Sequence, residues 1–322
     1  MADPVKCPVC DAICNEPPLY EYTVEEAAAH FCPSARDAGR NQRLLDCIRR
    51  LWNDGNCNVF QCPRCTFGFG HPFVGGDEVF YGILHEQKGY PQWKWDFDIA
   101  LQEVVNGGGK ILDIGAGDGA FLRSLDKSWD RFAVEGSEET RAPLEKAGIK
   151  VFRDLASAAT ADRESFEVVT MFQSLEHIAE FRPVLRQAHE LLKPGGRIFI
   201  TVPDGEAMIR QEKLVNAPDM PPNHICKWTP KSLGLALEQA GFKPGSAVPE
   251  PSSMQSLRGN MHLKVLANAA QPGSLTAYVY RIKSRPLRIP FMALLGVISC
   301  LPLLPHLGGL RRGGAFAISA TA

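Results

Sequence analysis

Apolar residues recur along the middle of the chain with two periods, one typical of buried strands and one typical of helices. Five short apolar runs have the length of strands: residues 110–114, 131–134, 149–152, 166–171 and 197–202. Segments with helical spacing separate these runs. Strands that alternate with helices are typical of a parallel sheet covered on both faces. We therefore predict an α/β fold with a doubly wound, mostly parallel sheet.

A glycine-rich turn follows the first of these strands. Gly115, Gly117 and Gly119 stand between that strand and a helical segment that starts near residue 120. Glycines in this position let backbone amides approach a ligand at the helix N-terminus. The second strand ends at Glu135, 20 residues after Gly115, where a carboxylate can accept hydrogen bonds from two ribose hydroxyls. The pattern predicts a site for a ribonucleoside cofactor.

Two cofactors are compatible with this turn, a dinucleotide and S-adenosylmethionine. The glycines have the spacing G-x-G-x-G, whereas the dinucleotide fingerprint is G-x-G-x-x-G. Asp113 lies two residues before the first glycine, where its charge would repel a pyrophosphate and attract a cationic ligand. S-adenosylmethionine is therefore favoured, and a nicotinamide-dependent oxidoreductase is the weaker alternative.

Four motifs resemble those of class I S-adenosylmethionine-dependent methyltransferases. They are ILDIGAGDG, AVEG after the second strand, SLEH after the fourth and LLKPGG before the fifth. The resemblance covers about residues 95–245 and the end of the chain. It implies a Rossmann-like sheet of seven strands, with GGAFAISATA as the last, antiparallel strand.

The resemblance also implies a set of cofactor contacts. In chain order these are Asp113 with Gly115, Ala116, Gly117 and Gly119 for the methionine moiety, Glu135 for the ribose, Asp154 with Leu155 for the adenine, and Phe172 with Gln173 for a wall of the pocket. Three of these residues have plainer interpretations. Glu135 could be a solvated strand end, Asp154 a turn former and Phe172 a core residue.

Cysteines are concentrated near the N-terminus, where eight of the ten lie between Cys7 and Cys65. The first residues show no secretory signal, so we expect reduced thiols in a cytoplasmic protein. Two CPxC turns, Cys7 with Cys10 and Cys62 with Cys65, match the ligand spacing of a structural zinc site. Four thiolates would close the coordination shell and leave no position for a substrate. Buried, metal-free thiols are the alternative.

The two cysteine pairs are separated by 51 residues, more than a compact zinc ribbon needs. Helical patterns in TVEEAAAHF, with Thr23 as the N-cap, and in RNQRLLDCIRRLW predict a helical insertion between the halves of the ribbon. Cys47 falls on the apolar face of the second helix. Cys14, Cys32 and Cys57 have no partner cysteine at two-residue separation, and a second metal site among these four cysteines is a less favoured alternative.

A second resemblance includes this module. The two CPxC turns, CTFGFGHPF and NHICKWTPKSLGLALEQAGF are similar to bacterial small-molecule methyltransferases with an N-terminal zinc-binding domain, some of which methylate sugar carbons. This implies a small-molecule acceptor, although O-, N- and C-methylation all remain open.

Two histidines are candidate general bases. His177 follows the fourth strand at the sheet edge where α/β proteins bind ligands, and His224 lies in a proline-rich loop that could cover the pocket. For His177 a structural role or a substrate contact is the alternative. An RNA or protein acceptor and a non-catalytic cofactor-binding protein are the competing functions, and the module lacks the basic and aromatic cluster that would predict nucleic-acid binding.

Composition excludes several classes of protein. The 322 residues are 45% hydrophobic and 22% charged, and the net charge is −1. A disordered chain would have fewer apolar residues, a nucleic-acid coat protein would have a basic excess, and a multi-span membrane protein would have several long apolar runs.

One apolar run near the C-terminus leaves a more limited membrane contact possible, although a multi-span membrane protein is excluded. Residues 289–310 contain no charged side chain and are flanked by arginines and lysines. Prolines interrupt the run, and the predicted last strand follows it, so we expect a helical insertion packed on the domain, with peripheral membrane contact as the alternative and a true span as the least favoured.

The predicted organisation has four parts. Residues 1–90 form the zinc-binding module, 91–285 the methyltransferase domain, 286–310 the apolar helical insertion and 311–322 the last strand.

Overall fold

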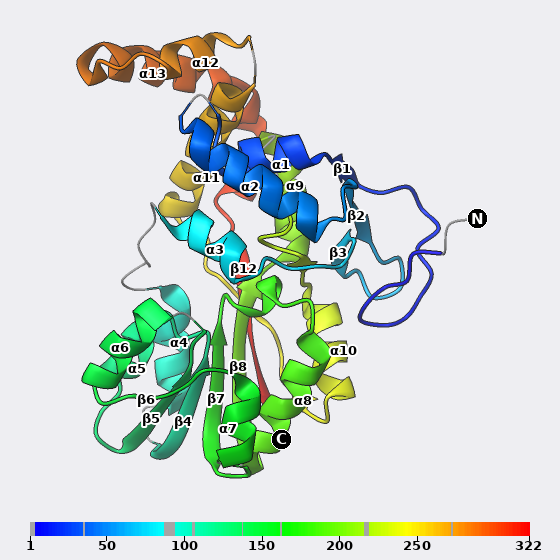
Figure 1. Cartoon of the computed structure of the whole chain (residues 1–322), viewed down its shortest axis with the longest axis vertical. Helices are drawn as coiled ribbons and strands as arrows, with labels where there is room; N and C mark the ends of the chain where they lie inside the picture. The colour runs from blue at the N-terminus through cyan, green and yellow to red at the C-terminus, as the bar shows by residue number, and fades with distance from the viewer. Residues whose placement is uncertain are drawn as a thin grey trace.

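The computed structural model describes residues 4–34, 36–86, 94–104, 107–136, 138–161, 163–215, 219–271 and 273–322. The described chain has three parts, namely an N-terminal module, an α/β domain and a helical unit inserted before the last strand (Figure 1). The predicted boundary at residue 90 lies outside the described residues.

The α/β domain is built on one twisted sheet. Its parallel strands are β4 (Gly109–Ile114), β5 (Trp129–Val134), β6 (Lys150–Phe152), β7 (Phe166–Phe172) and β8 (Leu192–Pro203). The last strand, β12 (Ala315–Thr321), runs antiparallel between β8 and β10 (Lys243–Pro244). The order β10-β12-β8-β7-β4-β5-β6 confirms the predicted doubly wound sheet of seven strands, and the short β11 (Val248–Pro249) adds an eighth beside β12.

Helices cover both faces of this sheet. Side chains alternate in direction along each strand, so Leu112 and Ile111 enter two different cores. The core with Leu112 holds α7 (Leu155–Ala161), α8 (Phe181–Leu191) and α10 (Pro230–Gln239). The core with Ile111 holds α4 (Trp95–Val104), α5 (Ala120–Ser124) and α6 (Glu138–Lys146).

The N-terminal module combines three strands with three helices. The strands are β1 (Tyr20–Tyr22), β2 (Cys57–Gln61) and β3 (Gly68–His71). The helices are α1 (Val24–Phe31), α2 (Ala38–Leu51) and α3 (Glu78–His85). Thr23 and Glu26 form a capping box at the start of α1, as the sequence predicts. The two helices expected between the cysteine pairs are therefore α1 and α2.

The sheet of the module is completed by the α/β domain. After β8 and α9 (Gly205–Val215), the chain forms β9 (Cys226–Lys227), which pairs antiparallel with β3. The second sheet has the order β1-β2-β3-β9. The module is consequently not a separate body, because its edge strand comes from residues more than 150 positions away in sequence.

An aromatic cluster fills the junction between the two parts. Trp228 is fully buried, with its ring centroid 4.6 Å from that of Phe67 in the module and 5.0 Å from that of Phe181 in α8. Its indole Nε1 donates a hydrogen bond of 3.4 Å to the Leu175 carbonyl. One side chain thus packs against elements of both parts.

The helical unit is larger than the sequence predicts. It comprises α11 (Met254–Ala270), α12 (Leu275–Tyr280), α13 (Arg285–Cys300), the 3₁₀ helix η2 (Leu301–His306) and α14 (Leu307–Leu310). The predicted insertion began at residue 286 and missed α11, because α11 mixes charged, polar and apolar residues and has no sustained apolar run. A small separate core of Val215, Leu257, Cys300, Leu303 and Leu310 attaches the unit to α9.

We predict that Trp228→Ala lowers the free energy of unfolding by about 3–5 kcal/mol, because it opens a cavity at the junction. Urea denaturation followed by circular dichroism measures this loss. Trp228→Phe keeps an aromatic ring in place and should cost clearly less. A loss below about 1 kcal/mol for the alanine variant would contradict the role given to the junction.

Candidate active site

The glycine turn between β4 and α5 has a backbone that only glycine adopts easily. Gly115, Gly117 and Gly119 have φ angles of 79°, 55° and 73°. A Cβ at Gly119 would lie 2.3 Å from Leu144 Cδ2, and one at Gly115 would lie 3.0 Å from Ser174 Cβ. The backbone conformation and the close packing therefore both require glycine, which has no side chain. The turn, with Ala116 inside it, is a cradle of backbone at the carboxyl edge of the sheet.

Asp113 lies under this cradle. It is buried, and its Oδ1 accepts a hydrogen bond of 2.9 Å from Thr170 Oγ1 in β7. Burial raises the pKa of its carboxyl group to about 7, although the Thr170 hydroxyl favours the charged form. A cationic ligand above the turn would stabilise the carboxylate, which agrees with the sequence argument for a sulfonium cofactor.

Glu135 and Gln173 stand on either side of the cradle. Glu135 follows β5, and its Oε2 accepts a hydrogen bond of 3.0 Å from the Gly117 amide. Gln173 follows β7 with a φ of 49°, and its buried Nε2 has no hydrogen-bond partner among the described residues. A buried unpaired donor is costly unless a ligand satisfies it. The cradle, the strand-end carboxylate and this donor together fit a nucleoside cofactor.

The other predicted cofactor contacts have local structural roles. Asp154 is exposed and caps α7, accepting hydrogen bonds of 2.7 Å from the Ser157 amide and 2.6 Å from the Ser157 hydroxyl. These bonds lower the pKa of its carboxyl group. Leu155 is buried as the first residue of that helix. The adenine contact predicted for this pair stays a prediction.

Phe172 lies in the core on the α4 and α5 face of the sheet. Its ring centroid is 4.8 Å from that of Phe97 and 4.7 Å from that of Phe121. The side chain was predicted to form a wall of the pocket. At the last position of β7 it packs against two helices, as the alternative core role expects, and the pocket contact stays a prediction.

A second cluster lies next to the cradle, after β7. The side chain of Ser174 packs closely against Gly115. Ser174 is followed directly by a 3₁₀ turn, η1 (Leu175–His177). The rings of His177 and His224 are 4.8 Å apart, and His177 Nε2 lies 3.9 Å from Glu176 Oε1. The structure therefore brings together the two histidines that the sequence analysis proposed separately.

Glu176 belongs to this cluster but was not predicted. It is 1% exposed, and its Oε2 has no hydrogen-bond partner among the described residues. Burial raises the pKa of its carboxyl group to about 7, although His224 favours the charged form. Its position beside His177 in the SLEH motif is the only sequence signal that could have identified it.

A row of buried charges orients His224. Its Nδ1 lies 2.6 Å from Asp219 Oδ1, and Asp219 Oδ2 lies 3.5 Å from Lys227 Nζ. Lys227 Nζ also donates a hydrogen bond of 2.7 Å to Glu212 Oε1 in α9. Lys227 and Glu212 are almost fully buried, so each charge needs the next one as a partner.

This row shifts the pKa values of both partners at the site. Burial alone would lower the pKa of His224, but the Asp219 carboxylate raises it above the ordinary histidine value of 6.5. Burial alone would likewise raise the pKa of Asp219, but His224 and Lys227 hold it well below its usual range. The short Nδ1–Asp219 distance is an ion-pair contact without hydrogen-bond geometry, and the other ring nitrogen, Nε2, is the candidate for taking a proton.

Tyr81 of the N-terminal module covers this cluster, and we call Tyr81 and the Asn223 carbonyl that it contacts the roof of the site. The hydroxyl of Tyr81 in α3 lies 3.1 Å from His177 Nδ1 and donates a hydrogen bond of 3.2 Å to the Asn223 carbonyl. The same carbonyl lies 2.6 Å from His177 Nδ1, which fixes this nitrogen as the protonated one. Tyr81 and His177 are 96 positions apart, so no local pattern could have predicted this contact.

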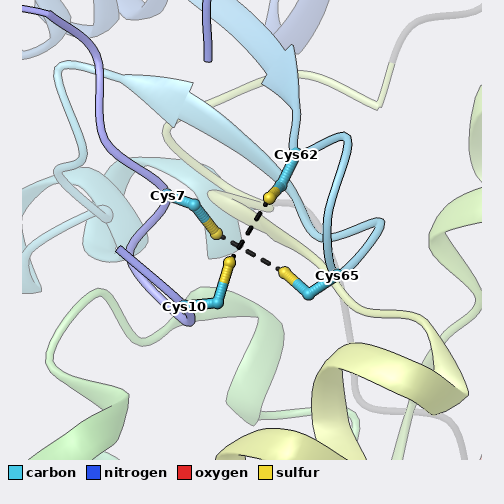
Figure 2. Close-up of side chains that lie close together, drawn as sticks. All are labelled: Cys7, Cys10, Cys62 and Cys65. Carbon is cyan, nitrogen blue, oxygen red and sulfur yellow. Dashed lines mark hydrogen bonds between the residues drawn. The ribbon is translucent and has the colours of Figure 1, made fainter. Parts of the chain in front are cut away.

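The four predicted metal ligands form a second possible site within the module. The sulfur atoms of Cys7, Cys10, Cys62 and Cys65 point toward one common centre (Figure 2). The Cys7–Cys65 and Cys10–Cys62 sulfur pairs are each 3.5 Å apart, and all four sulfurs lie within 4.8 Å of one another. Tetrahedral zinc with bonds of about 2.3 Å would set its sulfurs about 3.8 Å apart. The four thiols fit a zinc ion.

Helices of the α/β domain bind the backbone of both cysteine turns. Arg182 in α8 donates hydrogen bonds to the carbonyls of Pro8 and Val9 at 2.8 and 3.1 Å. Lys231 in α10 donates one of 2.6 Å to the Arg64 carbonyl. The metal cluster therefore sits against the domain. Cys14, Cys32, Cys47 and Cys57 are buried and lie outside the four-sulfur group.

Three side chains of the histidine cluster after β7 could also hold an ion. The ligand atoms of Glu176, His177 and His224 lie within 4.8 Å of one another. In both histidines Nδ1 faces an acceptor, and this is how protein acceptors orient metal-bound imidazoles. The same geometry suits either proton transfer or a divalent cation.

Residues 92–246 match the model of a family described as "Methyltransferase domain". The match covers just under half of the chain, and the sheet order and glycine cradle of these residues agree with a methyltransferase fold. The match also supports S-adenosylmethionine as the cofactor.

Curated relatives resemble only part of the chain. The ubiquinone biosynthesis O-methyltransferase of Pseudomonas putida (strain F1) is 31% identical over 110 residues, which are 31% of this chain and 47% of that protein. The enzyme of that name from Ralstonia nicotianae is 33% identical over 104 residues, which are 29% of this chain and 43% of that protein. The chain thus spans about half the length of these relatives.

Solved structures of low identity resemble the chain more broadly. An S-adenosylmethionine-dependent methyltransferase from Mesorhizobium loti has 16% identity and a TM-score of 0.45, and the match covers 72% of this chain and all of that one. The [4+2]-cyclase SpnF has 20% identity and a TM-score of 0.45, with 73% of this chain and 84% of that one covered.

We predict that Glu135→Gln weakens S-adenosylmethionine binding by about 10- to 100-fold, because a neutral amide would replace the carboxylate expected to accept hydrogen bonds from two ribose hydroxyls. Isothermal titration calorimetry measures the affinity. Glu145→Gln, at an exposed position of α6, is the matched control and should bind like the wild type. Equal affinity in Glu135→Gln and the control would rule out the ribose contact.

Proposed function

We propose that the protein transfers the methyl group of S-adenosylmethionine to a hydroxyl group of a small molecule. The observation that carries this proposal is the Asp219–His224 pair, because the His224 ring packs against His177, three residues after Ser174, which approaches Gly115 of the glycine cradle. The name of the curated relatives, ubiquinone biosynthesis O-methyltransferase, supports the same reaction.

The cofactor supplies an electrophilic methyl group on a sulfonium sulfur. During transfer the acceptor oxygen forms a bond to the methyl carbon as the carbon–sulfur bond breaks, and the hydroxyl proton leaves. In this proposal His224 Nε2 takes that proton, and the Asp219 carboxylate stabilises the imidazolium that forms. The remaining acceleration comes from holding donor and acceptor in line.

The roof over the cluster favours a small acceptor. Tyr81 and the Asn223 carbonyl cover His177 from the module side, and Gly75 approaches so closely that a Cβ there would lie 2.5 Å from the His177 carbonyl. A macromolecular acceptor would need an open approach to this edge. The described geometry therefore supports a metabolite over RNA or a protein, the competing acceptors from the sequence.

A divalent cation is a second way to activate the hydroxyl. The arrangement of Glu176, His177 and His224 favours it, since three ligand groups converge and Glu176 Oε2 is unpaired among the described residues. Such an ion would lower the pKa of a bound hydroxyl, and the two mechanisms predict different responses to metal.

We also propose that Cys7, Cys10, Cys62 and Cys65 hold a structural zinc ion. The four converging sulfurs support this assignment. Hydrogen bonds from the backbone amides of Cys65 and Arg64 support it too, since they lower the pKa of Cys62 to about 7 against the effect of burial. The ion would fix both cysteine turns against α8 and α10.

We predict about one equivalent of zinc in the wild-type protein and a large loss in Cys62→Ser/Cys65→Ser. Atomic absorption on the purified chain measures the metal. Cys300→Ser, a buried cysteine of the helical unit, is the control and should keep the wild-type zinc content. Undiminished zinc in the double variant would reject the assignment.

A screen of hydroxylated metabolites with labelled S-adenosylmethionine tests the reaction, and the product should carry the label on oxygen. We predict that kcat/KM rises with pH as His224 loses its proton, with a midpoint above 6.5. Asp219→Asn removes the carboxylate that raises this pKa, so the midpoint should move down. His224→Gln should lower kcat by about 100-fold or more while cofactor affinity is retained.

Three results would contradict the base mechanism. They are label on nitrogen or carbon, an unshifted midpoint in Asp219→Asn, and activity that a brief chelator treatment abolishes and Mg²⁺ or Mn²⁺ restores. The last result would assign Glu176, His177 and His224 to a catalytic metal, provided that the zinc content of the treated protein is unchanged.

A further inference from the structure

The helical unit exposes an unusual concentration of apolar side chains. Of the sixteen large hydrophobic residues that are exposed in the described chain, thirteen lie between Met254 and Leu304. Soluble proteins seldom leave contiguous apolar patches of this kind without a partner. In Figure 1, α12 and α13 project beyond the rest of the molecule, at the end away from α7.

Helix α13 has two different faces. Gly296, Ser299 and Cys300 face α11, where Ser299 Oγ accepts a hydrogen bond of 2.8 Å from Asn268 Nδ2. The opposite face carries an apolar stripe with helical spacing, formed by Leu287, Phe291, Leu294, Ile298 and Leu301, and each of these residues is more than half exposed. The helix is therefore anchored on one side and uncovered on the other.

Charge is distributed unevenly between this unit and the rest of the chain. Eight of the 35 Lys and Arg residues follow Glu250, and no Asp or Glu does. The other 27 basic residues share residues 1–250 with all 36 acidic ones. Exposed Arg281, Lys283 and Arg285 lie at one end of the apolar stripe, and exposed Arg311 and Arg312 follow its other end. An apolar stripe between clusters of basic residues is complementary to an anionic lipid surface.

The chain connections indicate that the unit lies on a bilayer and does not cross it. Residues Arg285–Leu310 are long and apolar enough for a span, and an 18-residue window within them has a mean hydropathy of 2.0. However, the end of this segment lies beside the start of the helical unit, because the amide of Ser253, the N-cap of α11, donates a 2.8 Å hydrogen bond to the Arg311 carbonyl. Asn260 Nδ2 likewise donates to the Leu310 carbonyl at 2.8 Å, and β12 then enters the central sheet beside β11.

From these observations we propose that the stripe on α13 and its flanking basic residues dock the protein on the surface of an anionic phospholipid bilayer. The stripe inserts among the acyl chains, and the arginines and lysines contact the headgroups. This proposal does not depend on the reaction proposed above, because binding can be measured without an acceptor.

Cosedimentation of the full chain with vesicles tests the proposal. The wild type should pellet with vesicles of equal parts phosphatidylcholine and phosphatidylglycerol at low salt, and much less with pure phosphatidylcholine. Phe291→Gln/Leu294→Gln should weaken binding by about tenfold or more. Lys283→Gln/Arg285→Gln should weaken it by about fivefold for each charge removed and flatten its salt dependence.

Matched control variants outside the helical unit test whether the loss of binding is specific to the apolar stripe and its flanking basic residues. Val79→Gln removes a comparably exposed apolar side chain in α3, and Arg123→Gln removes an exposed charge in α5. Both should bind like the wild type. Thermal unfolding checks that every variant is folded, and the salt dependence of the wild type tests the charge contribution without any substitution.

Two results would overturn the proposal. One is absence of binding to the anionic vesicles at low salt, or binding that Phe291→Gln/Leu294→Gln and Lys283→Gln/Arg285→Gln both leave unchanged. The other is a concentration-dependent dimer in sedimentation analysis that Phe291→Gln/Leu294→Gln abolishes while vesicles are not bound, which would assign the face to a second copy of the chain.

Discussion

The pairing of β9 with β3 is the contact on which the rest of the structure depends. It joins the loop after α9 to the N-terminal module, and His224 stands two residues before the paired strand. Trp228, directly after the strand, fills the junction between Phe67 and Phe181. The position of His224 relative to the glycine cradle is therefore set by the module as much as by the sheet. A zinc ion at the four cysteines would stabilise that placement, because these cysteines share a core with Cys226 and Trp228 and because α8 and α10 bind both cysteine turns.

Burying charged side chains is energetically unfavourable, and here acidic and basic residues alternate so that each charge has an opposite charge beside it. Lys227 alone would be strongly destabilised in the junction, but Glu212 and Asp219 neutralise it. Asp219 in turn keeps His224 oriented. Such a row contributes little net stability compared with apolar packing, and in the proposed mechanism its role is to hold the Asp219 carboxylate charged beside His224. Glu176, buried and half satisfied, is the part of the site most sensitive to what binds there.

The sequence is informative where function depends on local pattern. The glycine turn, the strand-end Glu135 and the two cysteine turns each follow from spacing within a few residues, and the structure places each of them at its expected element. Tyr81, Asp219 and Lys227 could not be predicted, because their roles arise from tertiary contacts across the module boundary. Phe172 was assigned to the pocket by the family resemblance, and its packing against α4 and α5 is a tertiary contact that the sequence does not specify. Helix α11 was missed because it lacks the apolar periodicity that its neighbour α13 has.

A crystal structure with S-adenosylhomocysteine would test the central claim most directly, since that claim places the methyl donor between the glycine cradle and the module roof. We expect the ribose at Glu135, the homocysteine moiety over Gly115–Gly119 and the sulfur facing the cluster of Glu176, His177 and His224. A sulfur directed away from these three side chains, with His224 separated from it by other protein atoms, would contradict the account.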